Sequence, residues 1–196
     1  MTKKSITAII QVTNDCNLRC PYCYANSEKF EKNYMNETTL KNVIEQLMKT
    51  FDEVRIQWHG GEPTLVCEKF FKKVKKLQSV FSNCRVINGI QTNGTLLTEK
   101  FLDFCKKEDF QISLSLDGNK HLHNLTRIYP NGSGSFDKVM KVISLMKNKE
   151  IKFGAICILN KNNIKEIDEI YDFFNENQID VRINSVEPTG RAKINN

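Results

Sequence analysis

Three cysteines stand close together near the start of the chain. Cys16, Cys20 and Cys23 follow the spacing Cys-x3-Cys-x2-Cys, directly after the first apolar run. Three thiolates held this close can bind metal. In an iron–sulfur cubane each iron takes one cysteine thiolate, so three cysteines leave the fourth iron open to a substrate or cosubstrate. The spacing therefore predicts a 4Fe-4S cluster with one accessible iron.

A zinc site and a disulfide framework are the other uses that these cysteines could have. A structural zinc site usually takes four ligands from two pairs. The remaining cysteines stand singly, at Cys67, Cys84, Cys105 and Cys157. The total of seven cysteines is odd and no secretory signal peptide precedes them, which argues against disulfides. Zinc stays open as the alternative to the cluster.

Strand and helix patterns alternate along the chain. Runs of β-branched and apolar residues predict strands at 6–12, 54–58, 86–91, 112–116, 153–159 and 181–186. Apolar residues at helical spacing predict helices at 36–48, 70–80, 98–105, 136–145 and 164–174. Strict alternation implies parallel strands joined by right-handed helical crossovers. The pattern predicts an α/β fold with one parallel sheet.

Composition describes an ordinary soluble domain. The chain has 196 residues, of which 40% are hydrophobic and 27% charged, so residues 1–196 are expected to form a single domain. No apolar run approaches the roughly 20 residues that a membrane-spanning helix needs. Unpaired cysteines fit a reducing compartment. We expect a cytoplasmic protein with no membrane partner.

The net charge of +6 raises the question of nucleic-acid binding. The lysines are scattered along helix patterns such as residues 70–77, as on a solvated outer face. No basic stretch interleaves with stacking aromatics in the way that nucleic-acid platforms do. A nucleic-acid partner is therefore not expected.

The cysteine motif, with Tyr22 at its aromatic position, resembles the signature of the radical S-adenosylmethionine (SAM) superfamily. Four further stretches match this family in order, at 58–65, 91–94, 113–118 and 187–192. Together they resemble the branch that contains anaerobic sulfatase maturases and ribosomal-peptide maturases. The resemblance implies a partial (β/α)6 parallel barrel of the radical SAM type, which carries a 4Fe-4S cluster and SAM.

The resemblance also implies a reaction. The reduced cluster passes one electron to SAM, and the resulting 5′-deoxyadenosyl radical abstracts hydrogen from an unreactive carbon. A peptide or protein substrate is expected, with a reductant such as a flavodoxin or ferredoxin. A radical SAM enzyme for small molecules, or a truncated metal-binding module without catalysis, are the alternatives.

The motifs all follow predicted strands, and ligands of parallel sheets gather at the carboxyl ends of the strands. By resemblance, Cys16, Cys20 and Cys23 hold the cluster. The residues implied to contact SAM are Tyr22, Gly60, Gly61, Glu62, Pro63, Thr92, Asn93, Ser115, Arg127, Leu159, Asn160 and Val186. Asp117 is a candidate for substrate or proton handling, and a turn-forming Asp before Gly118 is the alternative.

Two departures from the family pattern stand out. Asn124 occupies the position where the family's His-Asp-x-x-Arg segment commonly has an aspartate, which removes a charge beside Arg127. The family's larger members continue into a cysteine-rich C-terminal domain, called SPASM or Twitch, whereas this sequence stops just beyond Arg191. We expect either a fragment or a trimmed enzyme, without an added N-terminal peptide-binding domain.

Overall fold

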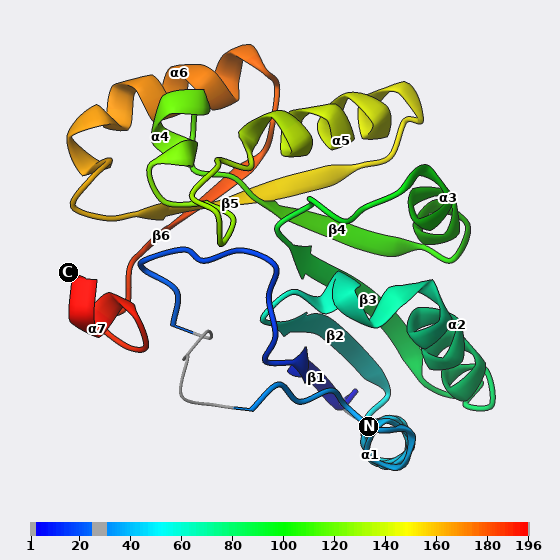
Figure 1. Cartoon of the computed structure of the whole chain (residues 1–196). Helices are drawn as coiled ribbons and strands as arrows, with labels where there is room; N and C mark the ends of the chain where they lie inside the picture. The colour runs from blue at the N-terminus through cyan, green and yellow to red at the C-terminus, as the bar shows by residue number, and fades with distance from the viewer. Residues whose placement is uncertain (1–2, 25–30, 196) are drawn as a thin grey trace.

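The structure is a computed structural model that describes residues 3–24 and 31–195. It contains one six-stranded sheet in which the strands follow each other in chain order, all parallel. The strands are β1 (Ser5–Thr13), β2 (Glu53–Gly60), β3 (Arg85–Thr92), β4 (Phe110–Ser115), β5 (Phe153–Leu159) and β6 (Val181–Ser185). The sheet curls into a half-barrel (Figure 1). The predicted partial (β/α)6 barrel is confirmed.

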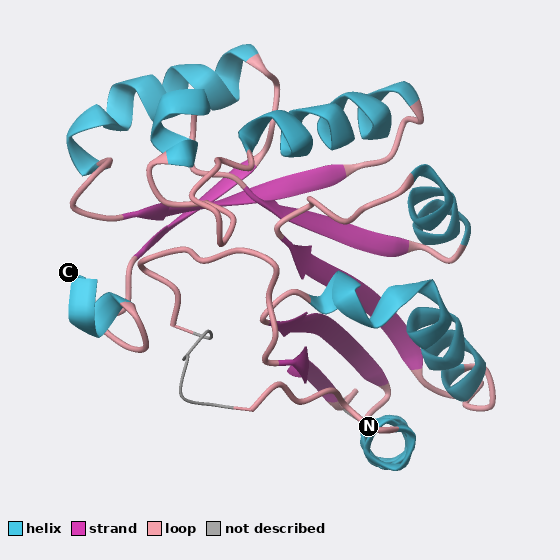
Figure 2. Cartoon of the chain, in the orientation of Figure 1, coloured by secondary structure: helices cyan, strands magenta, loops and turns pink. Residues whose placement is uncertain are grey.

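Helices connect the strands and cover the outer side of the curled sheet (Figure 2). The long ones are α1 (Glu37–Thr50), α2 (Cys67–Gln78), α3 (Glu99–Lys107), α5 (Phe136–Asn148) and α6 (Ile167–Glu176). The short helices are η1 (Pro63–Val66), α4 (Lys120–Asn124), η2 (Ile164–Glu166) and α7 (Ala192–Asn195). Asn36 caps α1 by accepting the Thr39 N–H at 2.8 Å, and Thr98 caps α3 in the same way.

The hydrophobic core lies between the sheet and the helices. Ile10, Trp58, Ile90 and Ile112 stand side by side across four strands, and all four are buried. The Trp58 ring meets Phe70 and Phe71 of α2 edge to face. Cys105 and Cys157 are fully buried in the same layer.

The inner face of the half-barrel carries the strand residues that alternate with those facing the core. Side chains alternate between the two faces of a strand. The neighbouring row, Ile9, Gln57, Gly89 and Gln111, therefore points away from the helices. Among the described residues, no helix covers this face (Figure 2), which leads to the edge where the six strands end. Among the described residues, none of the helices has the length and apolar character needed to cross a bilayer.

Candidate functional site

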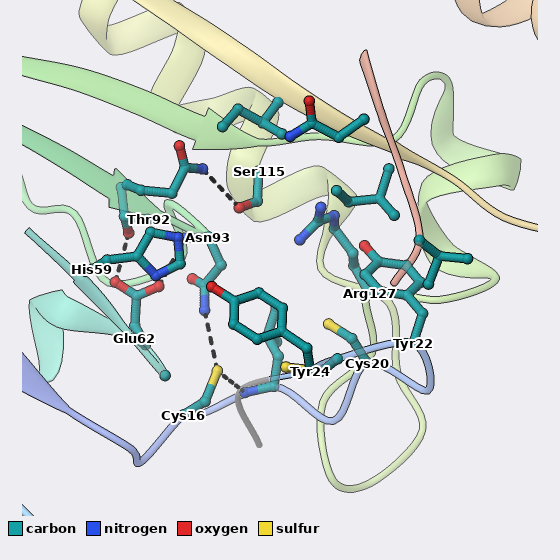
Figure 3. Close-up of a pocket in the computed structure, with 18 of the residues that line it drawn as sticks. Cys16, Cys20, Tyr22, Tyr24, His59, Glu62, Thr92, Asn93, Ser115 and Arg127 are labelled. Carbon is teal, nitrogen blue, oxygen red and sulfur yellow. Dashed lines mark hydrogen bonds between the residues drawn. The ribbon is translucent and has the colours of Figure 1, made fainter. Parts of the chain in front are cut away.

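A cavity of about 590 Å³ opens where the strands end, between the cysteine loop and the inner face of the sheet. Figure 3 shows labelled side chains from the cysteine loop, β2, β3 and β4 around it. The predicted metal and cofactor residues that line it are Cys16, Cys20, Tyr22, Cys23, Gly60, Gly61, Glu62, Thr92, Asn93, Ser115, Arg127 and Val186. Segments far apart in the sequence therefore meet at one mouth.

Four predicted site residues do not line this cavity. Pro63 is buried as the first residue of η1. Leu159 packs against the hydrophobic core, and the side chain of Asn160 builds a turn by accepting the Asn162 N–H at 2.9 Å. Asp117 lies behind the wall, bonded to Arg127. The roles predicted for these four residues stay predictions.

The three motif cysteines all face the cavity. Cys20 is buried, and Cys16 and Cys23 are half-buried. Burial raises the pKa of the Cys16 thiol to about 11 and that of Cys20 to about 12. The Cys16 sulfur accepts the Leu18 N–H at 3.4 Å. Metal binding at these thiols must therefore displace protons, as it does at thiolate sites generally.

Gly60 and Gly61 bring the end of β2 against the start of the cysteine loop. A Cβ on Gly61 would lie 2.0 Å from the Asp15 carbonyl oxygen, and one on Gly60 would lie 2.2 Å from that of Thr13. The Gly61 and Glu62 N–H groups donate to the same two carbonyls at 2.8 and 2.7 Å. The glycines therefore allow chain to pack on chain while they also line the cavity.

Glu62 is a buried carboxylate that is held by uncharged donors. It accepts hydrogen bonds from Thr64, from the Thr92 hydroxyl at 2.6 Å and from the Asn93 N–H at 2.7 Å. Burial raises the pKa of Glu62, and these hydrogen bonds offset part of that rise. Among the described residues, no lysine or arginine forms an ion pair with it. Within the described part of the chain, its negative charge therefore has no cationic partner at the cavity wall.

Asp117 is the second buried carboxylate at this rim, and it is paired with a cation. Arg127 donates to it twice, from Nε at 2.8 Å and from Nη2 at 3.0 Å. The Tyr22 hydroxyl and the Ile158 N–H also donate to it. Burial alone would raise the pKa of Asp117, but the Arg127 guanidinium lowers it. The saturated carboxylate ties three segments together.

Arg127 and Ser115 have hydrogen-bond donors at the cavity that the described residues do not fully use. The Arg127 guanidinium lines the cavity beside the Tyr22 ring, 5.5 Å from its centroid. Its Nε and Nη2 groups donate to Asp117. The Ser115 oxygen accepts the Gln91 amide at 3.1 Å, so its own O–H can donate elsewhere. Figure 3 places Ser115 and Arg127 across the cavity from Cys16.

Several lining residues were missed by the sequence analysis. Tyr24, Ile156 and Ile158 line the cavity, although none belongs to a predicted contact. Strand alternation was the signal for the two isoleucines, because Leu159 has the opposite parity on β5. His59 accepts the Gly60 N–H at Nδ1 (2.7 Å), which leaves Nε2–H as its donor, and burial lowers its pKa.

The side chain of Asn124 accepts a hydrogen bond at the N-terminal end of α5. Its Oδ1 accepts the Phe136 N–H at 3.1 Å, at the first turn of α5. The side chain also fills the space beside Gly134, where a Cβ would lie 2.0 Å from the Asn124 side-chain carbon. The departure from the family's aspartate therefore keeps an oxygen acceptor at this position.

Comparisons with known proteins agree on one family. The family model described as the Radical SAM superfamily matches residues 10–174. A cysteine-type anaerobic sulfatase-maturating enzyme of Clostridium perfringens is 31% identical, over 84% of this chain and 46% of its own length. A serine-type anaerobic sulfatase-maturating enzyme of Bacteroides thetaiotaomicron is 36% identical, over 82% of this chain and 41% of its own length.

A solved structure is similar over nearly the whole chain. It is described as native anSMEcpe with bound AdoMet and Kp18Cys peptide, AdoMet being SAM. It superposes with a TM-score of 0.87 at 28% identity and covers 93% of this chain and 52% of that one. The chain thus spans about half the length of the relatives that it matches.

Proposed function

Because the chain belongs to the radical SAM superfamily, we propose that it binds a 4Fe-4S cluster through Cys16, Cys20 and Cys23 and holds SAM in the adjoining cavity. The observation that carries this proposal is the convergence of the three thiols with Glu62 and Ser115 around one cavity. Radical SAM enzymes use this cluster and SAM together. When both are bound, the reduced cluster would supply the electron for cleavage of SAM, which leads to hydrogen abstraction from carbon.

The arrangement of the thiols favours a cluster over zinc. The three motif cysteines line the cavity, and among the described residues no fourth cysteine lines it with them. A structural zinc site usually takes four protein ligands. A cubane takes one thiolate for each of three irons and leaves the fourth iron open. Three thiols in one loop therefore suit a cluster that binds a further ligand.

The cavity suits a ligand such as SAM, which carries both positive groups and a carboxylate. The cavity volume of about 590 Å³ is within the usual range for small-molecule sites. The Glu62 carboxylate, which forms no ion pair among the described residues, would attract a positively charged group, and Arg127 and Ser115 offer donors to a carboxylate. Ile156 and Ile158 provide an apolar wall for the adenine.

The chain's own residues position and shield this ligand. Asp117 orients Arg127 and anchors Tyr22, so the cysteine loop and the wall of the cavity are held by one carboxylate. The Asn93 amide lies 3.8 Å from the Cys16 sulfur and can donate to it. Buried lining residues such as Glu62, Thr92 and Arg127 would shield one side of a bound ligand from water.

The substrate that we propose is a residue of a peptide or protein. The support is the similarity to cysteine- and serine-type sulfatase-maturating enzymes and to a structure that holds a peptide. The half-barrel is open beside the cavity, so a chain segment could approach the radical from the inner face of the sheet. An external reductant such as a flavodoxin or ferredoxin would supply the electron.

Anaerobic reconstitution with iron and sulfide tests the cofactor proposal. The protein is reduced with dithionite in the presence of SAM, and 5′-deoxyadenosine is measured by mass spectrometry. We expect the brown cluster absorbance and the product in the wild type and in Cys105→Ala, because Cys105 is buried away from the cavity. Cys20→Ala should lose both. Equal iron content in the two variants would overturn the ligand assignment, and the absence of any cluster in the wild type would return the motif to zinc.

The substrate class is tested by isotope transfer. The reconstituted protein is offered either a carbon-deuterated peptide digest or a carbon-deuterated metabolite extract. If the substrate is a polypeptide, 5′-deoxyadenosine gains mass with the peptides and not with the metabolites. The reverse pattern would identify a small-molecule enzyme instead.

A further inference from the structure

The stretch 187–192, which resembles the family's pattern, contacts the cysteine loop through its last residues. It follows β6, and its first residue, Glu187, lines the cavity beside Val186. Further along, the Arg191 N–H donates to the Cys23 carbonyl at 3.0 Å. The Arg191 guanidinium donates from Nη1 to the Cys20 carbonyl at 3.3 Å. One residue thus contacts the backbone of two motif cysteines.

Gly190 makes this contact sterically feasible. Its φ of +56° lies in the left-handed region that glycine adopts without a steric penalty. A Cβ at this position would lie 2.6 Å from the Tyr24 carbonyl oxygen and 2.7 Å from that of Cys23. Both distances are far inside van der Waals contact, and the atoms that would clash belong to the backbone. Any side chain at residue 190 would therefore push the cysteine loop away.

The contact joins the two edges of the open sheet. The cysteine loop follows β1 and the Gly190–Arg191 segment follows β6, and these strands lie at opposite ends of the strand order. Figure 1 shows the chain leaving β6 toward α7 beside the loop that follows β1. Ala192 is completely buried there. The two hydrogen bonds therefore join the loop after β1 to the segment after β6.

We propose that Gly190 and Arg191 are positioning residues that latch the cysteine loop to the end of β6, and this proposal rests on the proposed cluster site. The latch fixes the carbonyls of Cys20 and Cys23, so the intervening backbone cannot rotate the thiols away from the cavity. The guanidinium also brings positive charge to a loop that carries three thiolates when metal is bound. Loss of the latch lets the cluster dissociate more readily.

Two matched pairs of variants test the latch. Gly190→Ala is compared with Gly132→Ala, since Gly132 also has a positive φ (+83°) but open space around it. Arg191→Met is compared with Arg182→Met, at an exposed arginine on β6, and with Arg191→Lys, which keeps a charged donor. The first readout is the rate at which a chelator removes iron from the reconstituted protein. The second is amide hydrogen exchange of residues 16–24 in the metal-free protein.

We expect Gly190→Ala to lose iron at least tenfold faster than Gly132→Ala, with faster exchange in residues 16–24. Arg191→Met should behave in the same way, and Arg191→Lys should recover part of the difference. If Gly190→Ala does not fold, the Arg191 variants carry the test. Iron loss and exchange equal to those of the controls would overturn the latch.

The two proposals fail separately. If the wild type forms no cluster, the proposed function is wrong, while hydrogen exchange of the metal-free protein still tests the latch. If the cluster forms and all the variants retain it equally, only the latch is wrong. A fall in melting temperature with unchanged iron loss would identify a merely structural contact and would also overturn it.

Discussion

Glu62 and Asp117 are both buried at the carboxyl rim of the sheet, but different kinds of partner hold them. Among the described residues, Glu62, which follows β2, is held by hydroxyl and backbone donors and not by a cation. Asp117 follows β4 and is held by the guanidinium of Arg127. Burial raises the pKa of Glu62, whereas Arg127 lowers that of Asp117 despite burial. Only Glu62 lines the cavity.

This difference separates the binding part of the rim from its supporting part. A carboxylate that lines a cavity, with no cationic side chain paired to it among the described residues, is available to attract the positive charge of a ligand. A carboxylate that is saturated behind the wall holds its neighbours in place, and removing it leaves a buried cation without a partner. We therefore propose that Glu62 attracts the ligand and that Asp117 holds the wall together.

The largest effect is expected for Asp117→Asn. The change leaves the buried Arg127 charge uncompensated, and loss of one partner of a buried pair costs about 3–5 kcal/mol. The free energy of unfolding is measured by urea denaturation. Asp137→Asn is the control, because it removes a surface pair with Lys120 (2.7 Å), and such pairs contribute about 0–1 kcal/mol. Equal losses in the two variants would remove the distinction between the pairs.

Glu62→Gln should weaken ligand binding, and it should reduce stability less than Asp117→Asn does. The amide cannot accept all the donors that the carboxylate accepts, so we expect a loss of about 1–3 kcal/mol in unfolding free energy. Without the charge, SAM affinity should fall on the order of tenfold, equivalent to about 1.4 kcal/mol. Equilibrium dialysis of SAM with the reconstituted protein measures it. Unchanged affinity would place the cationic group of the ligand elsewhere.

Acid should weaken the Asp117 side of the rim through His123. This ring accepts the Asp117 N–H and lies against Ser135, and burial lowers its pKa to about 3. The unfolded chain binds a proton near pH 6.5 that the folded chain does not, so stability falls as the pH drops from about 6.5 toward 3. The slope reaches about 1.4 kcal/mol per pH unit.

Urea denaturation at pH 7 and pH 5 checks this prediction against His123→Gln. The variant lacks the titrating ring, so its stability should change less between the two pH values than that of the wild type. The same pH dependence in both proteins would show that His123 does not titrate on unfolding.

The smallest effect is expected for Asn124→Asp, which restores the residue common in the family. The carboxylate can still accept the Phe136 N–H, and it adds a negative charge at the N-terminus of α5. Such a charge stabilises by about 0.3–1 kcal/mol. Thermal unfolding measures the gain. A clear loss of stability would mean that the amide donors of Asn124 contribute more than its acceptor.

The sequence predicted what depends on local pattern. Alternating strands and helices define the half-barrel, and the short spacing of Cys16, Cys20 and Cys23 places them in one loop. Contacts between residues that are far apart in the sequence left no such local pattern. Arg127 looked like a free cation for a ligand carboxylate, but its fork is shared with Asp117. Gly190 looked like part of a motif, but its task depends on carbonyls from the opposite edge of the sheet.

The most direct test of a cluster with SAM beside it is the electron paramagnetic resonance spectrum of the reduced, reconstituted protein, recorded with and without SAM. If SAM binds the open iron in this cavity, its addition shifts the signal of the wild type. Glu62→Gln should then require more SAM for the same shift. A cluster signal that stays unchanged at saturating SAM would contradict the assignment of the cavity.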